Sequence, residues 1–161
     1  MPRLTVKELE SDRMAEAYPL IRRTTRVSPD RWERFGRDLT SRGGGMLAAI
    51  AEDGGVHGVA AYLPVVSLKH GKALRVEAIA AFELGHAALV RNALSSALDK
   101  LAREKGCEVV TVTLDAKGLA SPRSLRRRGW ESLGLTAETI EFVRRLDANC
   151  PGREPVEPIK T

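Results

Sequence analysis

The chain has 161 residues, which is enough for one domain with a sizeable core. Lys and Arg number 26 against 21 Asp and Glu, so the formal net charge is +5. No uninterrupted apolar run approaches the roughly 20 residues that a membrane-spanning helix needs. The first residues, MPRLTVKELESDR, lack the apolar core of a secretory signal. We therefore expect a cytoplasmic protein with no membrane contact.

Residues 1–146 are expected to form a single domain, and residues 147–161, rich in proline and charge, a disordered tail. Cys107 opens an apolar strand and Cys150 lies in the tail, so the sequence predicts neither a disulfide framework nor a zinc site. His57 and His70 lie on or beside strands without metal-ligand spacing, and no metal is expected.

The first half of the chain predicts one strand, two helices and three successive antiparallel strands. Residues 3–9 alternate apolar and polar side chains, as a strand does. A helix follows from Ser11, and Pro19 should kink or divide it. Ser28 and Pro29 are typical of the start of a second helix. The three strands are expected at Met46–Ala51, Val56–Ser67 and Ala73–Ala80.

The second half changes to helical periodicity at Gly85 and predicts a long helix that ends at Gly106. CEVVTVTL, which begins at Cys107, is dense in β-branched residues and indicates a buried strand. A short basic helix is expected from about Ser121, within SPRSLRRRGW, and Trp130 in this segment is expected to lie in the core. A final strand is expected at about AETIEFVRRL, residues 137–146.

A strand, a glycine turn and a helix start form an anion site, because the first turn of a helix has unpaired N–H groups at its positive end. The turn here reads Phe82-Glu83-Leu84-Gly85-His86-Ala87. Gly85 lets an anion approach the backbone, but Phe82 cannot donate a hydrogen bond. Glu83 adds a negative charge where the anion would lie, and a protonated His86 would compensate only in part.

In this order the elements resemble a GNAT-type N-acetyltransferase over about residues 3–146. The specific segments are the turn at Gly85–Ala87 and LRRRGW, and the overall match suggests a divergent bacterial branch of unassigned activity. The resemblance implies an α+β (mixed α/β) fold, with a twisted mixed sheet of six to seven strands flanked by about four helices. It also implies acetyl-CoA as co-substrate, admitted by a splay between the fourth and fifth strands.

The resemblance also implies which backbone groups would hold the co-substrate. The pantetheine arm would pair with Ala78, Ile79 and Ala80. The pyrophosphate would meet the N–H groups of the turn and helix start, namely Gly85, His86, Ala87, Ala88 and Leu89. The family turn reads Arg/Gln-x-x-Gly-x-Gly/Ala, so Phe82 departs from it at the first position.

Acyl transfer to an amine needs a base, donors for the oxyanion and a proton for the leaving thiolate. Glu77 lies on the strand where the family often places its base. Alternation should place Leu74, Val76 and Ala78 on one face and Arg75, Glu77 and Ile79 on the other, so Glu77 should share a face with Arg75. A structural Arg75–Glu77 pair or a solvated sheet face explains the same pattern. Leu125 stands where the family acid, a Tyr, would be. Tyr62 or Ser124 could serve instead.

Two main hypotheses remain open at this stage. The first is an acetyl-CoA-dependent N-acetyltransferase acting on a small-molecule or protein amine. The second is a non-catalytic protein of this fold that binds a CoA-like ligand or a protein partner. Nucleic-acid binding through the arginines of 123–128 is the weakest alternative, since a solvated helix face explains them better. The glycines at 43–45 and the final strand each offer an edge for a homodimer.

Overall fold

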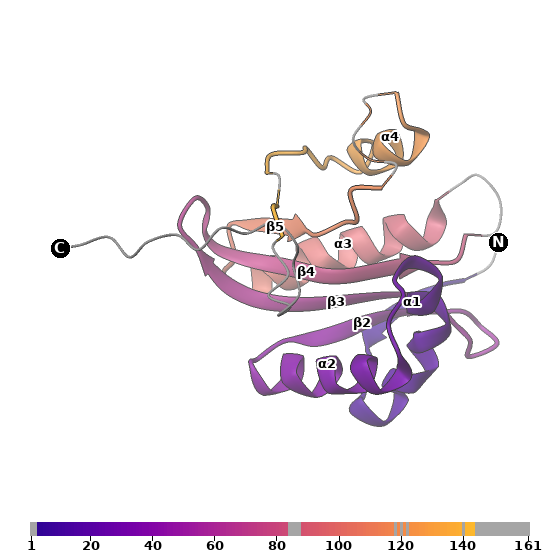
Figure 1. Cartoon of the computed structure of the whole chain (residues 1–161). Helices are drawn as coiled ribbons and strands as arrows, with labels where there is room; N and C mark the ends of the chain where they lie inside the picture. Colours follow the sequence, from indigo (N-terminus) through magenta and orange to yellow (C-terminus); the bar gives the residue numbers. More distant parts are fainter. Residues whose placement is uncertain are drawn as a thin grey trace, which may run out of the picture.

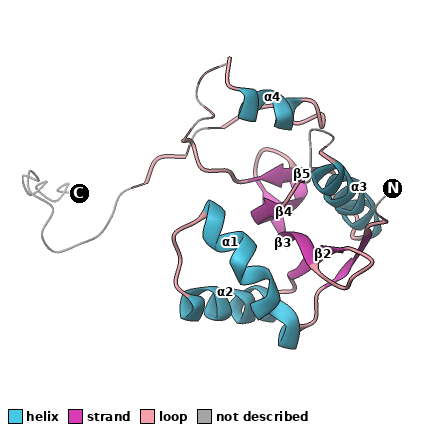
Figure 2. Ribbon diagram, turned by 90° about the vertical axis from the view of Figure 1, so that its right-hand side faces the viewer, coloured by secondary structure: helices cyan, strands magenta, loops and turns pink. Residues whose placement is uncertain are grey.

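The computed structural model of the chain describes residues 3–83, 88–117, 119, 121, 123–139 and 141–143. A five-stranded mixed sheet with helices on both faces forms its centre (Figures 1 and 2). The strands follow the order β1-β2-β3-β4-β5; the first four are antiparallel neighbours, and β5 pairs with β4 in parallel. Their bounds are β1 Thr5–Glu8, β2 Gly45–Ile50, β3 Val56–Ser67, β4 Gly71–Ala81 and β5 Val109–Val112.

The helical elements begin and end largely where the local sequence dictates. They are the 3-10 segment η1 Ser11–Ala17 and the helices α1 Tyr18–Thr24, α2 Pro29–Ser41, α3 Leu89–Glu104 and α4 Leu125–Glu131. Pro19 stands in the first turn of α1, where η1 gives way to it, so the expected division is confirmed. Ser28 caps α2 by accepting the N–H of Arg31 at 3.2 Å. Within the described ranges, no helix has both the length and the apolar character to cross a membrane.

Both faces of the sheet are covered, and successive strand residues alternate between two apolar clusters. On one face, here called the α1–α2 face, side chains of η1, α1 and α2 pack against residues such as Ala48 and Val59. On the other, the α3 face, α3 packs against residues such as Ala60 and Val76. Gly58 lets α3 approach β3, because a Cβ there would lie 2.4 Å from a methyl group of Val90.

The expected mixed α+β architecture with four helices is confirmed, but the described residues contain five strands rather than six or seven. Residues 137–139 and 141–143, part of the expected final strand, have no strand structure, and Phe142 is 91% exposed. A β-branched pattern without a neighbouring strand to pair with does not secure a strand. Ile140 and residues 144–161, which include the expected tail, lie outside the described residues.

We expect Leu94→Ala to lower the free energy of unfolding by about 2–5 kcal/mol, because Leu94 is fully buried between α3 and the sheet. Leu125→Ala is the matched control, since Leu125 is 82% exposed and its loss should change stability by less than about 0.5 kcal/mol. Urea unfolding followed by circular dichroism measures both. Equal losses in the two variants would contradict the packing of α3 on the sheet.

Candidate functional site

A β-bulge lies in the middle of β4. The residues of β3 and β4 pair in one register up to Ala61 and Ala78, and Tyr62 then pairs with Val76. Glu77 is therefore the extra residue, without a partner on β3. A bulge bends its strand and re-aims the side chains around it. It consequently sets the direction of the residue that the sequence analysis proposed as the base.

The bulge changes which side chains of β4 share a face. Arg75 and Glu77 do share one, as expected, and their charged groups approach to 3.7 Å. Ala78, however, packs on the α1–α2 face, while Ile79 packs on the α3 face together with Val76. The expectation that Ala78 lies with Val76, and Ile79 with Arg75, is wrong, because strict alternation does not continue across an inserted residue.

β4 and β5 separate halfway along β4. Their pairing ends at Val76 and Val112, and the N–H of Thr113 donates to the Val76 carbonyl at 3.0 Å. Beyond this point the N–H of Phe82 donates to His57 of β3, so alternation turns the N–H and C=O groups of Ile79 and Ala81 away from β3. Within the described residues no strand pairs with that side of β4 after Val76.

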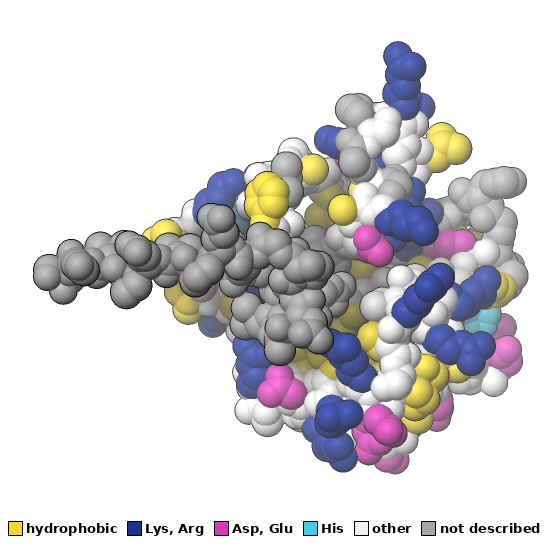
Figure 3. All heavy atoms as spheres, viewed as in Figure 1, with side chains coloured by type: hydrophobic (Ala, Val, Ile, Leu, Met, Phe, Trp, Pro, Cys, Tyr) yellow, Lys and Arg dark blue, Asp and Glu magenta, His cyan; other side chains and the backbone are white. Residues whose placement is uncertain are grey.

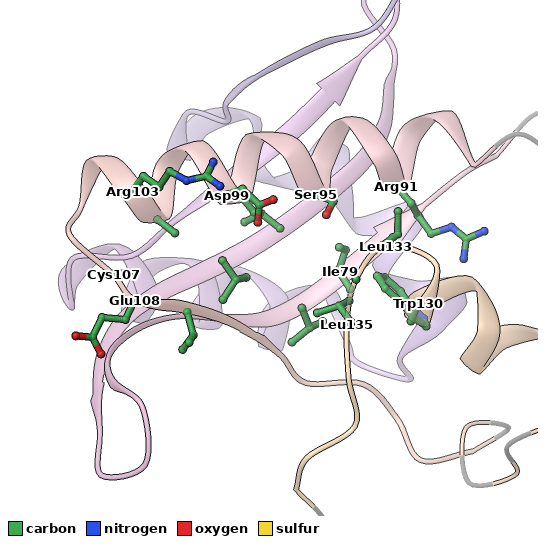
Figure 4. Close-up of a pocket in the computed structure, with 16 residues that line it drawn as sticks. Ile79, Arg91, Ser95, Asp99, Arg103, Cys107, Glu108, Trp130, Leu133 and Leu135 are labelled. Atoms are coloured by element: carbon green, nitrogen blue, oxygen red, sulfur yellow. The ribbon is translucent and has the colours of Figure 1, made fainter.

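A groove of about 370 Å³ lies beside this separation, between α3, β5 and α4 (Figure 4). Its floor is apolar and includes Ile79 and Val112. Arg91, Ser95, Asp99 and Arg103 line it from α3, and Trp130 lines it from α4. The groove thus joins an open strand edge to a wall that carries both signs of charge.

The start of α3 already has an anionic partner. The carboxylate of Glu83 accepts the N–H of Val90 at 3.1 Å and that of Arg91 at 2.8 Å. Its side chain is only 16% exposed, and it lies 3.7 Å from Nε of Arg91. Because Val90 and Arg91 are the second and third residues of α3, Glu83 caps the two N–H groups that an N-cap side chain normally satisfies.

Arg91 connects the start of α3 to α4. Its guanidinium lies 5.8 Å from the ring centroid of Trp130, and Gly129 makes room for it, since a Cβ there would lie 3.1 Å from Nη1. The Nε atom is buried and has no hydrogen-bond partner. Sequence reasoning missed Arg91 and placed Trp130 in the core. The only signal for their contact was the Gly129-Trp130 pair.

The segment after α4 returns along the groove. Leu133 and Leu135 line it, and Glu138 then forms ion pairs with Lys69 at 3.0 Å and His70 at 3.2 Å, both in the β3–β4 turn. Hydrogen bonding and charge from Lys69 lower the pKa of Glu138. The segment that contains α4 is therefore held in two places: by Arg91 at Trp130, and by Lys69 and His70 at Glu138.

The structure brings only part of the predicted co-substrate site together. Ala78, Ile79 and Ala80 lie on β4 beside its separation from β5. Ala88 precedes α3 in a left-handed conformation with φ 47°, and Leu89 is the first helical residue. Gly85, His86 and Ala87 lie outside the described residues, so the turn itself stays a prediction.

Tyr62, proposed as a second catalytic residue, lies on the α3 face and is nearly fully buried. Its hydroxyl donates to Glu8 at 2.6 Å, across Gly45, whose missing Cβ leaves the space for both groups. Burial raises the pKa of Tyr62 well above its usual range, and the hydrogen bond to Glu8 raises it further. A higher pKa makes the phenol a weaker acid, and its catalytic role stays a prediction.

The arginines of α4 behave largely as solvated side chains. Arg126 and Arg128 are exposed, and Arg127 pairs with Glu131 at 2.8 Å. In Figure 3 basic side chains are scattered over this view of the molecule, with acidic ones between them. No single basic surface of the kind that nucleic acid requires is visible on this face.

No protein-family model and no curated protein sequence matches the chain. Its fold does match solved structures. An aminoglycoside N-acetyltransferase, AAC(6')-Iy in complex with CoA, superposes with a TM-score of 0.73 at 13% identity, covering 91% of this chain and 97% of that one. A ribosomal-protein-alanine N-acetyltransferase from Brucella melitensis gives 0.65 at 18% identity, covering 89% and 100%.

A third match with the same fold is a transcriptional regulator from Bacillus halodurans, with a TM-score of 0.68 at 14% identity over 89% of this chain and 100% of that one. The chain therefore has the GNAT N-acetyltransferase fold, and the resemblance in element order is confirmed at this level. At these identities the match describes the fold alone, and activity must be argued from the site.

We expect Glu83→Ala to lower the free energy of unfolding by about 1 kcal/mol, because two N–H groups at the start of α3 lose their acceptor. Glu104→Ala, at the exposed far end of the same helix, is the control and should change stability by less than about 0.5 kcal/mol. Urea unfolding measures both. If the two variants are equally stable, Glu83 does not cap the helix.

Proposed function

We propose that the protein is an N-acyltransferase that takes its acyl group from a pantetheine thioester, with acetyl-CoA as the first donor to test. The observation that carries this proposal is the open edge of β4 after Val76, where Ile79 and Ala81 turn backbone N–H and C=O groups toward the separation from β5. The arm of pantetheine contains two amides, and an extended amide chain pairs with a free strand edge as another strand would.

Glu77 is the residue that we assign as the base. The bulge places it at the point where β4 and β5 separate, and its side chain is partly exposed, so it can reach an amine directly or through one water. Arg75 forms an ion pair with this carboxylate at 3.7 Å. In the transfer, Glu77 takes one proton from the ammonium, and the neutral nitrogen then bonds to the thioester carbonyl carbon. The C–S bond breaks, and the second proton lost by the nitrogen passes to the departing thiolate.

The leaving thiolate needs no dedicated acid in this scheme, because a thiol has a pKa of about 8.5 and leaves with limited assistance. That agrees with Leu125 at the position where the family has a Tyr, and with a Tyr62 hydroxyl that already donates to Glu8. The scheme therefore depends on the free strand edge for donor binding and on Glu77 for the proton.

A non-catalytic protein of the same fold is the second candidate. Two observations favour it: Phe82 replaces the Arg or Gln of the family turn, and Glu83 occupies N–H groups at the start of α3. A structural neighbour that is a transcriptional regulator has this fold as well. Binding of acetyl-CoA without release of thiol in the presence of any amine would favour this candidate.

We expect Ile79→Pro to weaken acetyl-CoA binding by about tenfold or more, because proline removes an N–H from the open edge and leaves the β3 side of β4 paired. Ile79→Val shortens the side chain but keeps the N–H, so it should bind nearly as the wild type does. Calorimetric titration measures both affinities, and circular dichroism checks that both variants fold. Equal binding by the two variants would refute the edge-pairing model.

We expect Glu77→Gln to lower kcat by about 10²–10⁴-fold with little change in KM for acetyl-CoA, because the amide cannot take a proton. The assay is thiol release with a panel of amines chosen from the neighbours' substrates: an aminoglycoside and a peptide with N-terminal alanine. Glu104→Gln is the charge-matched control at an exposed site. Undiminished turnover in Glu77→Gln would exclude Glu77 as the base.

A further inference from the structure

We propose that Glu83 makes this chain select its thioester donor by the pantetheine arm and not by a nucleotide diphosphate. The inference rests on the proposed acyltransfer function and goes beyond it, because it names the part of the donor that is recognised. The open edge of β4 suits a pantetheine arm, whereas the start of α3 does not suit a diphosphate.

The carboxylate of Glu83 already occupies the start of α3. Val90 and Arg91 donate their N–H groups to the two carboxylate oxygens of Glu83, at 3.1 and 2.8 Å. These hydrogen bonds place a carboxylate on the positive end of α3, at the helix start to which the family resemblance assigns a pyrophosphate. An incoming diphosphate would either displace Glu83, with loss of both bonds, or lie next to a fixed negative charge.

Arg91 is the cation beside Glu83 at the start of α3. Arg91 would be the natural compensating charge, but its Nε lies 3.7 Å from Glu83 and its guanidinium lies over Trp130 and beside Gly129. Recruiting it for a diphosphate would separate it from a carboxylate that is 16% exposed. The family position that could supply another donor is Phe82, which has none. Arg91 is therefore already engaged by Glu83 and Trp130.

The open edge of β4 and the groove beside it remain for recognition of the donor. The backbone of Ile79 and Ala81 and the apolar floor of the groove contact an arm and make no demand on a phosphate. The donor class is accordingly any pantetheine thioester, with or without a nucleotide diphosphate. Such an arm exists as a small thioester or attached to a carrier protein, and both sources share the same chemistry at the open edge.

The experiment titrates four ligands into the wild type, Glu83→Gln and the exposed control Glu104→Gln. The ligands are CoA, pantetheine, a carrier protein bearing a phosphopantetheine arm, and inorganic pyrophosphate. In the wild type we expect CoA and pantetheine to bind within about threefold of each other. In Glu83→Gln we expect CoA and pyrophosphate to bind about tenfold tighter, with pantetheine unchanged, since a charge at a helix start changes anion binding by this order. Tighter binding of the carrier protein than of pantetheine identifies the carrier as the source.

Glu83→Ser also removes the charge and should show the same gain, so the test does not depend on the folding of one variant. CoA binding more than about 30-fold tighter than pantetheine in the wild type would overturn the inference. An unchanged ratio of CoA to pantetheine affinity in both Glu83 variants would do the same while leaving the proposed function intact. If neither CoA nor pantetheine binds any variant, the proposed function fails and the inference fails with it.

Discussion

β4 is paired along its whole length with β3 but along only its first half with β5, and the arrangement of the site depends on this difference. Antiparallel pairing on one side holds β4 in the sheet. On the other side, the pairing stops at Val76 and Val112. The next residue, Glu77, is inserted by a bulge, so the last ladder contact with β5 and the candidate base are adjacent in the chain. The free strand edge and the carboxylate thus lie next to each other on β4.

The second half of the site is governed by charge at the start of α3. A helix start that is buried against the body of a protein needs a partner for its N–H groups. In this chain Glu83 supplies that partner, which stabilises the fold in the absence of any ligand. The same contact places a carboxylate at the helix start, where a phosphate would otherwise be attracted. Stability of the empty protein and recognition of a diphosphate are therefore in opposition at this position, as stability and function often are at binding sites.

Local signals in the sequence were sufficient for much of the fold. The cap at Ser28, the interruption at Pro19 and the bounds of β3 were all predicted, because each depends on residues close in the chain. The bulge was not predicted. Alternation in LRVEAIAA stops at the apolar run Ala78–Ala81, but such a run does not locate an inserted residue, whose position depends on pairing with β3. The capping by Glu83 was missed although its charge was noted, because α3 begins four residues after Gly85, where the helix was expected to begin. Trp130 was assigned to the core by hydrophobicity alone, whereas Arg91 holds it at the groove.

The missing side chain of Gly58 has a mechanical consequence. Because α3 lies so close to β3, it cannot move further toward the sheet, and its buried leucines keep it from moving away. The opposite wall is different: α4 has no buried side chain, and it is held through Arg91 and through a hydrogen bond from Arg126 to the carbonyl of Lys117. Small units with few buried contacts open at low free energy. The groove thus has one fixed wall, α3, and one weakly held wall, α4, so the backbone amides of α4 should exchange with solvent sooner than those of α3.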